Sequence, residues 1–401
     1  MSRTIPIKMF DLTGYILEKI EFPNDTNIYL FCHLKRKTMK FKSQTSNRIS
    51  TTRKRKIKHQ IFEGKIVWII IEQRRFYFSK YDKRLWEKLP NISIKKQTSD
   101  TYRLNTIKSL KNSTYTYNAE TRKSSPMFCS RLVDDLPEIN IYWPTVIKKI
   151  GLDGKNIGKH KQMFTLTNLD KNELISAITP MNQKQLINHI NTTEFSHRKA
   201  VKEVCIDMDK FMKAVALKCF PLAKIVIDQF HVIQYCIWNL DKYRCRIQKI
   251  KKLNLMPAKQ LLAKPYYKLK NEEKVKLSLC LLEHPDLKEG YEILKNLRKV
   301  YTAKSYFDAK KQLDYVIELC KNSQIPDMID FRKTILRWYD EILNYHLSKT
   351  TNSFTEGIHN RFECIKRNHY GVRNYDRFVK RLMYTFIPAT LFTDLLSKVV
   401  G

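Results

Sequence analysis

The sequence predicts a mixed α/β fold that is interrupted by a long all-helical segment. Between positions 146 and 239, short apolar runs alternate with amphipathic segments, as strands and helices do along an α/β chain. Several of these apolar runs end on an aspartate. From position 240 to 347 the pattern becomes almost wholly helical, and Glu356 follows this segment. The fold is therefore expected to have a core in two parts, 148–239 and 348–401, around a helical insertion.

Three strands are expected first. IKKIGLD is a short apolar run that ends on Asp153. MFTLTNLDKNELISAIT predicts two more strands, Met163–Thr167 and Leu174–Thr179, which are joined by a turn around Asp170. Strands this close in sequence are expected to pair antiparallel.

Helices and strands then alternate. MNQKQLINHINTTEF predicts a helix, EVCIDMD a strand ending on Asp207, and KFMKAVALKCF an amphipathic helix. AKIVID predicts a strand ending on Asp228, and HVIQYCIWNLDKYRCRI is helical after it. The insertion contains helical stretches such as EEKVKLSLCLLEH and FDAKKQLDYVIELC.

The amino-terminal part, 1–99, is predicted to be a small basic module. Between Lys35 and Lys58 there are eleven Lys or Arg and no Asp or Glu, and the strand-like run KIVWIIIEQRRFYF follows. Such a run is commonly a solvated face, but it also fits a contact with a phosphate backbone. The residues expected to bind DNA are Lys35, Arg36, Lys37, Arg53, Lys54, Arg55 and Lys56. Residues 100–147 fit a helix-turn-helix and a linker.

The composition favours a polyanionic partner. The 401 residues carry a net charge of +36, and nucleic acid is the usual partner of so basic a protein. A membrane-spanning protein is disfavoured because the apolar run Ile66–Ile71 is too short to cross a bilayer. The start of the chain lacks a signal-peptide core, so a soluble, cytoplasmic and nucleoid-associated protein is expected. The nine cysteines form no C-x-x-C pair and are expected to be reduced thiols.

Three acids are candidates for a metal site. Asp153 and Asp207 end predicted strands, and Glu356 shares a helix face with Asn352 and Asn360, four residues to either side. For Glu356, a solvated helix face is the simplest alternative, and Asp207 and Asp228 fit helix caps equally well. If the three acids converge, they would bind two Mg²⁺ or Mn²⁺ ions and act on a phosphodiester.

Two blocks of sequence resemble the ISL3 family of bacterial insertion-sequence transposases. The first is VCIDMDKFMKAVALKCFPLAKIVIDQFHV, and the second is TNSFTEGIHNRFECIKRNHYGVRNYDRF. IGLDGKNIGKHKQMFTLTNLD is similar to the family's first catalytic strand and hairpin. The resemblance covers roughly residues 145–401.

The resemblance implies a ribonuclease H-like core in which Asp153, Asp207 and Glu356 form an Asp-Asp-Glu catalytic triad that holds the metal ions. Asp228 and His231, in DQFH, also match the family, and they are expected to support the site. For His231, a capping and packing role is the favoured interpretation. The supporting residues expected around the triad are Asp228, His231, Asn352 and Asn360.

The chain departs from the family in two places. Gly154 stands where members usually have Glu after the first Asp. The family's amino-terminal zinc module usually has two cysteine pairs, but only Cys32 remains, with Lys35 in place of its partner and Phe78 and Tyr81 in place of the second pair. Zinc is therefore not expected, because such a site needs about four ligands.

The function expected is metal-dependent DNA cleavage and strand transfer by a transposase. Its partners would be the element's terminal inverted repeats, target DNA and a second or further copy of the chain. Two alternatives remain open at this stage: an inactive or repurposed DNA-binding relative, and a metal-dependent nuclease with a similar core.

Overall fold

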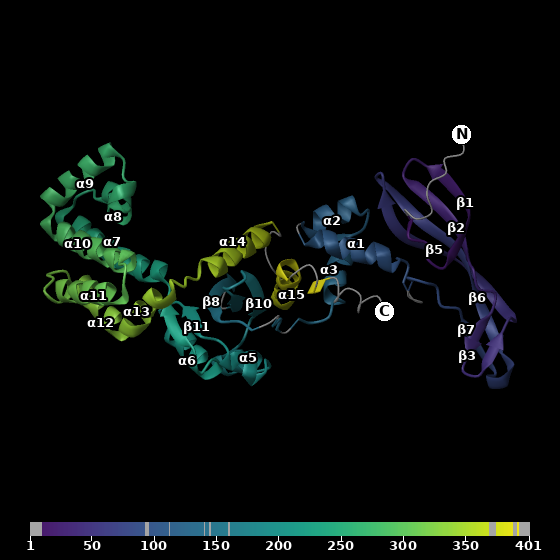
Figure 1. Cartoon of the computed structure of the whole chain (residues 1–401). Helices are drawn as coiled ribbons and strands as arrows, with labels where there is room; N and C mark the ends of the chain where they lie inside the picture. The colour runs from purple at the N-terminus through teal and green to yellow at the C-terminus, as the bar shows by residue number, and fades with distance from the viewer. Residues whose placement is uncertain are drawn as a thin grey trace. The chain divides into compact units, whose positions relative to one another are not determined.

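Residues 140–363 form one unit of the chain, and residues 1–139 with 364–401 form the other. Figure 1 shows the elements of both units in the computed structural model. The structure describes residues 10–92, 96–111, 113–139, 141–143, 146–158, 161–368, 374–387 and 391–392.

A five-stranded sheet is the centre of the unit 140–363. Its order is β10-β9-β8-β11-β12, in which β8, β9 and β10 are antiparallel neighbours and β8, β11 and β12 run parallel. The strands are β8 (Lys149–Gly158), β9 (Lys161–Asn168), β10 (Glu173–Ile178), β11 (Glu203–Ile206) and β12 (Lys224–Ile227). The predicted mixed α/β fold is confirmed.

Three short helices connect the strands. They are α4 (Gln183–Ile190), α5 (Phe195–Lys199) and α6 (Lys210–Cys219). Val204, Cys205 and Ile206 of β11 are all fully buried. Because successive strand residues point to opposite faces, both faces of the sheet must be covered at this strand.

Seven helices follow β12, where the sequence predicts a helical insertion. They are α7 (Gln229–Lys251), α8 (Met256–Ala263), α9 (Asn271–Glu283), α10 (Pro285–Thr302), α11 (Tyr306–Lys321), α12 (Pro326–Arg337) and α13 (Tyr339–Ser348). One hydrophobic core runs from the sheet into these helices. The chain returns to the sheet edge at α13, where the Asn344 side chain donates a hydrogen bond to the Ile225 carbonyl at 2.8 Å. Helix α14 (Ser353–Arg367) comes next.

The other unit contains a second sheet, in the order β1-β2-β6-β5, with β7 also paired to β6. Its strands are β1 (Tyr15–Asn24), β2 (Asn27–Leu34), β5 (Ile49–Phe62), β6 (Lys65–Phe78) and β7 (Lys83–Trp86), and β3 (Met39–Phe41) and β4 (Gln44–Ser46) form a separate hairpin. β6 coincides with the predicted strand KIVWIIIEQRRFYF. The long partner β5 was not predicted, because its basic residues conceal the alternation of a strand.

Helices α1 (Asp100–Leu110), α2 (Tyr115–Thr121) and α3 (Pro126–Asp134) follow this sheet. Helices α1 and α3 share a small core with α15 (Tyr375–Phe386), and Arg377 of α15 forms an ion pair of 2.6 Å with Asp134. Arg131 is the only basic residue of α3. The helix-turn-helix stays a prediction. Part of the motif YGVRNYDRF, residues 370–373, lies outside the described residues.

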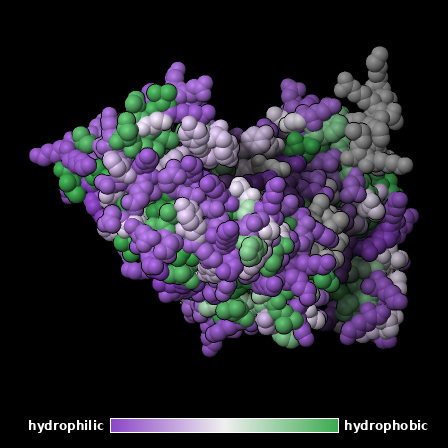
Figure 2. Space-filling view, turned by 60° about the vertical axis from the view of Figure 1, so that its left-hand side comes forward, coloured by the Kyte–Doolittle hydropathy of each residue, from purple (hydrophilic) through white to green (hydrophobic). Residues whose placement is uncertain are grey.

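Hydrophilic side chains cover most of the face in Figure 2, and hydrophobic ones appear there in small separate groups. Over the described residues, no helix combines the length and the apolar character needed to cross a bilayer.

Candidate active site

Asp153 lies in the middle of β8, and two donors hold its carboxylate. The Gly154 amide donates to Oδ1 at 2.6 Å, and His359 Nδ1 lies 3.2 Å from Oδ2. The prediction that the strand ends on Asp153 is wrong, because residues 154–158 continue the pairing with β9. The polar residues Lys155 and Asn156 hid this continuation in the sequence.

Asp207 follows the last residue of β11, on the strand next to Asp153. The parallel pairing of these strands places Gly151 opposite Cys205. Asp153 and Asp207 each come two residues later, so the two aspartates lie at the same level on neighbouring strands. Side chains two residues apart share a face of a strand. The topology therefore brings the first two acids together.

The alternative that Asp207 caps the following helix is wrong. Asp209 is the N-cap of α6, and its carboxylate accepts a hydrogen bond from the Phe211 amide at 2.7 Å. The Asp207 carboxylate instead forms an ion pair with His231, with 2.9 Å between Oδ1 and Nε2.

Asp228 is a helix cap, as the alternative interpretation allowed, and it also anchors α14. Its Oδ1 accepts from the Phe230 amide at 2.8 Å at the start of α7, and its Oδ2 accepts from the Asn352 amide. The side chain is almost fully buried. Asp228 thus fixes the start of α14 beside the first turn of α7.

Glu356 lies in the first turn of α14, and its face is not simply solvated. Its Oε1 lies 3.3 Å from Nε2 of His231, and the side chain is 34% exposed. Asn352 on the same face is fully buried, whereas Asn360 is exposed. The Asn352 side chain accepts a hydrogen bond from the Thr355 hydroxyl at 2.6 Å.

His231 therefore contacts two of the three acids, which is more than the packing role expected from the sequence. Burial alone would lower the pKa of its imidazole. The hydrogen bond and charge of Asp207, with the charges of Asp228 and Asp153, outweigh burial and raise the pKa to about 9. At neutral pH the ring is a cation between Asp207 and Glu356.

The acids also influence one another. Burial raises the pKa of Asp207, and the charges of Asp153 and Asp228 add to this, against the lowering effect of His231. Burial and the charges of Asp228, Asp153 and Asp207 likewise raise the pKa of Glu356. The carboxylates are close enough to repel, so a cation between them would be favourable.

His359 is a site residue that the sequence did not reveal. It lies three residues after Glu356 on α14 and is almost fully buried. Its Nδ1 faces Asp153, and its Nε2 lies 2.7 Å from the Thr165 hydroxyl on β9. The only signal was its place one turn beyond Glu356, and a lone buried histidine is common in protein cores.

A divalent cation fits the chemistry of these donors, although their side chains are not arranged around one ion in this structure. Three carboxylates supply the hard oxygen ligands that Mg²⁺ and Mn²⁺ prefer. Among the described side chains, however, no group of three acids, histidines or cysteines stands ready to hold one ion. In the arrangement described, His231 contacts both Asp207 and Glu356, and His359 pairs with Asp153.

Comparison with known proteins supports the resemblance seen in the sequence. The ISL3 family of DDE transposases, described simply as "Transposase", matches residues 150–382, which is more than half of the chain. The chain belongs to this family. A curated relative, the transposase for insertion sequence element IS1001 of Bordetella parapertussis, is 24% identical over 195 residues. That match covers 46% of this chain and about half, 48%, of the relative.

In this family member the seven predicted DNA-binding residues differ in their surroundings. Lys35, Arg36, Lys37, Lys54 and Lys56 are exposed. Arg53 donates two hydrogen bonds to the Gln73 side chain, at 2.9 and 2.7 Å, and stacks over Trp86 at 4.2 Å. Side chains of adjacent strand residues point to opposite faces. The residues 53–56 therefore present two basic side chains on each face of β5.

Cys32 and the aromatic replacements of the family's cysteines lie in different parts of the sheet. Cys32 is buried in the apolar core, and burial raises the pKa of its thiol to about 12. It pairs with Ile71 of β6, seven residues before Phe78. Phe78 and Tyr81 pack on Phe41, with ring centroids 5.5 and 5.6 Å apart. Phe41 thus contacts both aromatic residues that stand at the positions of the second cysteine pair.

Proposed function

We propose that this transposase cuts and joins DNA strands by metal-dependent phosphoryl transfer, with Asp153, Asp207 and Glu356 as its catalytic acids. The observation that carries the proposal is the placement of Asp153 and Asp207 at one level of adjacent parallel strands, with His231 linking Asp207 to Glu356. The acids come from three distant parts of the sequence.

The sheet supports this assignment. Three antiparallel strands followed by two parallel ones, in the order β10-β9-β8-β11-β12, are the topology expected of a ribonuclease H-like core. In α/β sheets, ligands gather where the parallel strands end. Asp207 follows the end of β11, and Asp228 follows the end of β12. Asp228 supports the site by positioning α14 rather than by contact with DNA.

Each acid is positioned by its neighbours. The Gly154 amide and His359 hold both oxygens of Asp153, and Thr165 fixes the far side of the His359 ring. The backbone N–H of Asn352 donates a hydrogen bond to Asp228, which fixes the start of the helix that carries Glu356. Asn360, which is exposed, is the weakest of the predicted supporting residues.

The proposed function consists of two phosphoryl transfers. In the first, a water oxygen attacks a phosphorus at the element's end, and the bond to the 3′ oxygen breaks and leaves a free 3′-hydroxyl. In the second, that hydroxyl oxygen attacks a phosphorus of target DNA and displaces another 3′-hydroxyl. When bound, Mg²⁺ or Mn²⁺ ions would activate the attacking oxygen and stabilise the leaving one. Asp153, Asp207 and Glu356 would hold them, while the protein keeps the DNA aligned.

DNA binding is assigned to the basic amino-terminal unit. Lys35, Lys37 and Lys54 are exposed and can reach phosphates, whereas Arg53 is engaged with Gln73 and Trp86. Each phosphate contact contributes about 0.9 to the slope of log K against log salt. Binding to double-stranded DNA is therefore expected to weaken steeply as salt rises.

The test is cleavage of a labelled duplex that carries the element's own end, in Mg²⁺ or Mn²⁺. Asp207→Asn is expected to bind this duplex but not to cut it. Asp308→Asn makes the same chemical change at an exposed position of α11, outside the candidate site, so it should cut like wild type. Binding without cleavage by the wild type would indicate a DNA-binding relative. Cleavage without joining would indicate a nuclease.

A further inference from the structure

We propose that a pocket beside Asp207 binds one unpaired nucleotide of the DNA strand that is being cut. This inference rests on the proposed function, because it takes DNA as the substrate of the neighbouring acids. It adds that the base next to the cut leaves the duplex.

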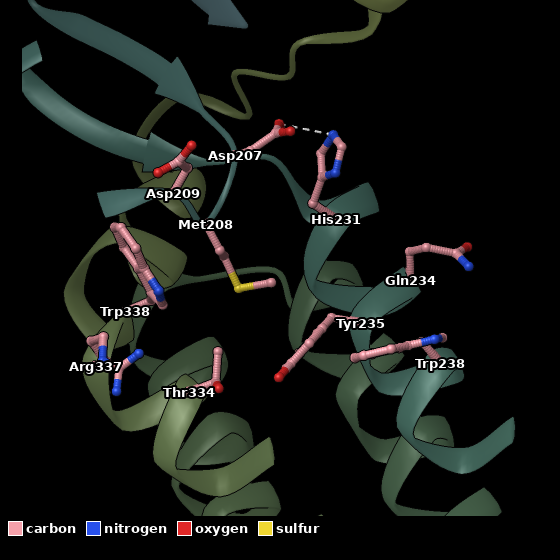
Figure 3. Close-up of a pocket in the computed structure, with 10 residues that line it drawn as sticks. All are labelled: Asp207, Met208, Asp209, His231, Gln234, Tyr235, Trp238, Thr334, Arg337 and Trp338. Atoms are coloured by element: carbon pink, nitrogen blue, oxygen red, sulfur yellow. Dashed lines mark ion pairs between the residues drawn. The ribbon is translucent and has the colours of Figure 1, made fainter. Parts of the chain in front are cut away.

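The pocket has a volume of about 550 Å³, within the range of pockets that hold small organic ligands. Asp207 and His231 lie at one end of it, so it opens beside the candidate acids (Figure 3). Helix α7 forms one wall, and α12 with the start of α13 forms the other. The side chains that face each other across it are Tyr235 and Trp238 on α7 and Thr334, Arg337 and Trp338 on the opposite wall.

The α7 wall offers an aromatic surface. Trp238 is 56% exposed, and its ring centroid lies 5.7 Å from that of Tyr235. Tyr235 in turn packs on the buried Phe331 at 5.9 Å, so its ring is held in place. Exposed aromatic rings on a fixed support are the surfaces on which unpaired bases stack, and any of the four bases has a face for this contact.

The opposite wall offers a positive charge. Arg337 is exposed, and among the described residues no carboxylate lies within ion-pair distance of it. Its basic neighbour Lys213, by contrast, is paired with Glu341 and lies 5.0 Å over the Trp338 ring. A guanidinium can bind a phosphate through two parallel hydrogen bonds. Trp238 on one wall can thus stack on the base of a nucleotide, while Arg337 on the other wall binds its phosphate.

The two walls favour an unpaired nucleotide over a base pair. A paired base is covered on both faces by its neighbours in the stack and cannot enter between α7 and α12. An extruded base exposes its faces to Trp238, and unstacking costs only a few kcal/mol, least where pairing is already weak. Since Asp207 lies at the end of the pocket, the nucleotide concerned is the one next to the cut phosphate.

The experiment compares two labelled duplexes of the element's end in metal-free buffer, using the full chain. One is fully paired, and the other has three mismatched thymines at the junction with flanking DNA. Fluorescence anisotropy gives the ratio of their dissociation constants. Trp238→Leu is expected to reduce the wild-type preference for the mismatched duplex about 5- to 150-fold, the range for loss of one base stack. Binding of the paired duplex should be unchanged.

Phe307→Leu is the matched control, because Phe307 on α11 is 72% exposed but does not line the pocket. Replacing the mismatched thymines by 5-iodouracil should give a photochemical cross-link to a peptide from α7. An unchanged preference in Trp238→Leu, an equal loss in Phe307→Leu, or cross-links outside the pocket would overturn the inference.

The two proposals fail separately. If the wild type cuts paired DNA but its preference does not depend on Trp238, the pocket inference is wrong and the transposase function stands. If the preference depends on Trp238 but no DNA is cut in Mg²⁺ or Mn²⁺, the pocket stands and the proposed catalysis is wrong.

Discussion

His231 on α7 and Asp207 after β11 form an ion pair of 2.9 Å, and the same imidazole nitrogen lies 3.3 Å from Glu356. A side chain from the first turn of α7 therefore supplies the positive charge between two candidate metal ligands. A bound cation would have the same electrostatic effect on them. On the proposed function, a bound cation would therefore take over the electrostatic role that His231 has without metal.

His231→Gln is accordingly expected to lower the free energy of unfolding by about 1 kcal/mol without metal, a modest figure because the pair is partly exposed. Added Mg²⁺ should stabilise this variant more than it stabilises wild type. Urea unfolding with and without MgCl₂ measures both effects. An equal loss of stability under both conditions would show that His231 does not substitute for a cation.

His359→Gln tests the positioning of Asp153. His359 links Asp153 to Thr165, and loss of such a partner of a metal ligand typically costs 10- to 100-fold in metal affinity or activity. We expect the Mg²⁺ concentration for half-maximal cleavage to rise about 10- to 100-fold. Thr165→Val should have a smaller effect in the same direction. A lower cleavage rate with unchanged Mg²⁺ dependence would contradict this role.

Gly151→Ala is expected to destabilise the protein by about 1–3 kcal/mol and to slow cleavage, as overpacking a buried contact does. A Cβ atom at Gly151 would lie 2.5 Å from the hydroxyls of Thr167 and Thr355 and closer still to Asn352. Helix α14, which carries Glu356, would have to move away from the sheet.

Gly357→Ala provides the matched control for that substitution. A Cβ atom there would meet nothing within 4 Å, and Gly357 is exposed in the first turns of α14. Since Ala favours a helix over Gly by about 1 kcal/mol, this variant should be more stable than wild type. Thermal unfolding of both variants decides the matter, and opposite signs are expected.

The sequence predicted most strands and helices of the core, because apolar runs leave a local pattern, and it singled out Asp153, Asp207 and Glu356 as candidate acids. It did not predict His359 or the pocket around Trp238 and Arg337, whose roles depend on residues far away in the chain. The caps were predicted in part. Asp228 is a helix cap, as one interpretation of the sequence held. The cap of α6, however, is Asp209 and not Asp207, and the preference of caps for Asp cannot distinguish two aspartates that lie two residues apart.

The amino-terminal sheet was harder to predict for an electrostatic reason. β5 contains a run of basic residues, and a basic residue, Arg53, stands at an inward-facing position where a strand usually has an apolar one. In the structure, Arg53 is accommodated there by its hydrogen bonds to Gln73 and by stacking on Trp86. Cation–π and amide contacts thus replace the aliphatic contacts by which strands are usually recognised.

His59 gives this amino-terminal unit a pH dependence. It is almost fully buried, and it contacts Ser99 at 2.9 Å and the Phe10 carbonyl. Burial lowers its pKa, although the Phe10 carbonyl and the charge of Asp11 oppose this. As the pH is lowered, His59 takes up a proton first in the unfolded chain, near its reference pKa of roughly 6.5, and only at lower pH in the folded chain. The free energy of unfolding therefore decreases as the pH is lowered from about 6.5.

His59 is expected to change the free energy of unfolding by at most about 1.4 kcal/mol per pH unit. Urea unfolding at several pH values from 7.5 to 5 measures it, and His59→Gln should make the dependence shallower. If the wild type and His59→Gln lose stability in parallel on acidification, another group is responsible.

The central claim is that one set of three acids performs the chemistry, and strand joining by a pre-cut element end tests it most directly. A labelled end with a free 3′-hydroxyl is incubated with plasmid target in Mg²⁺, with wild type, Glu356→Gln and the control Glu363→Gln, which changes another glutamate of the same helix. The wild type and Glu363→Gln should join the end to the plasmid, while Glu356→Gln binds the end but does not join it. Joining by Glu356→Gln at the wild-type rate would contradict the account.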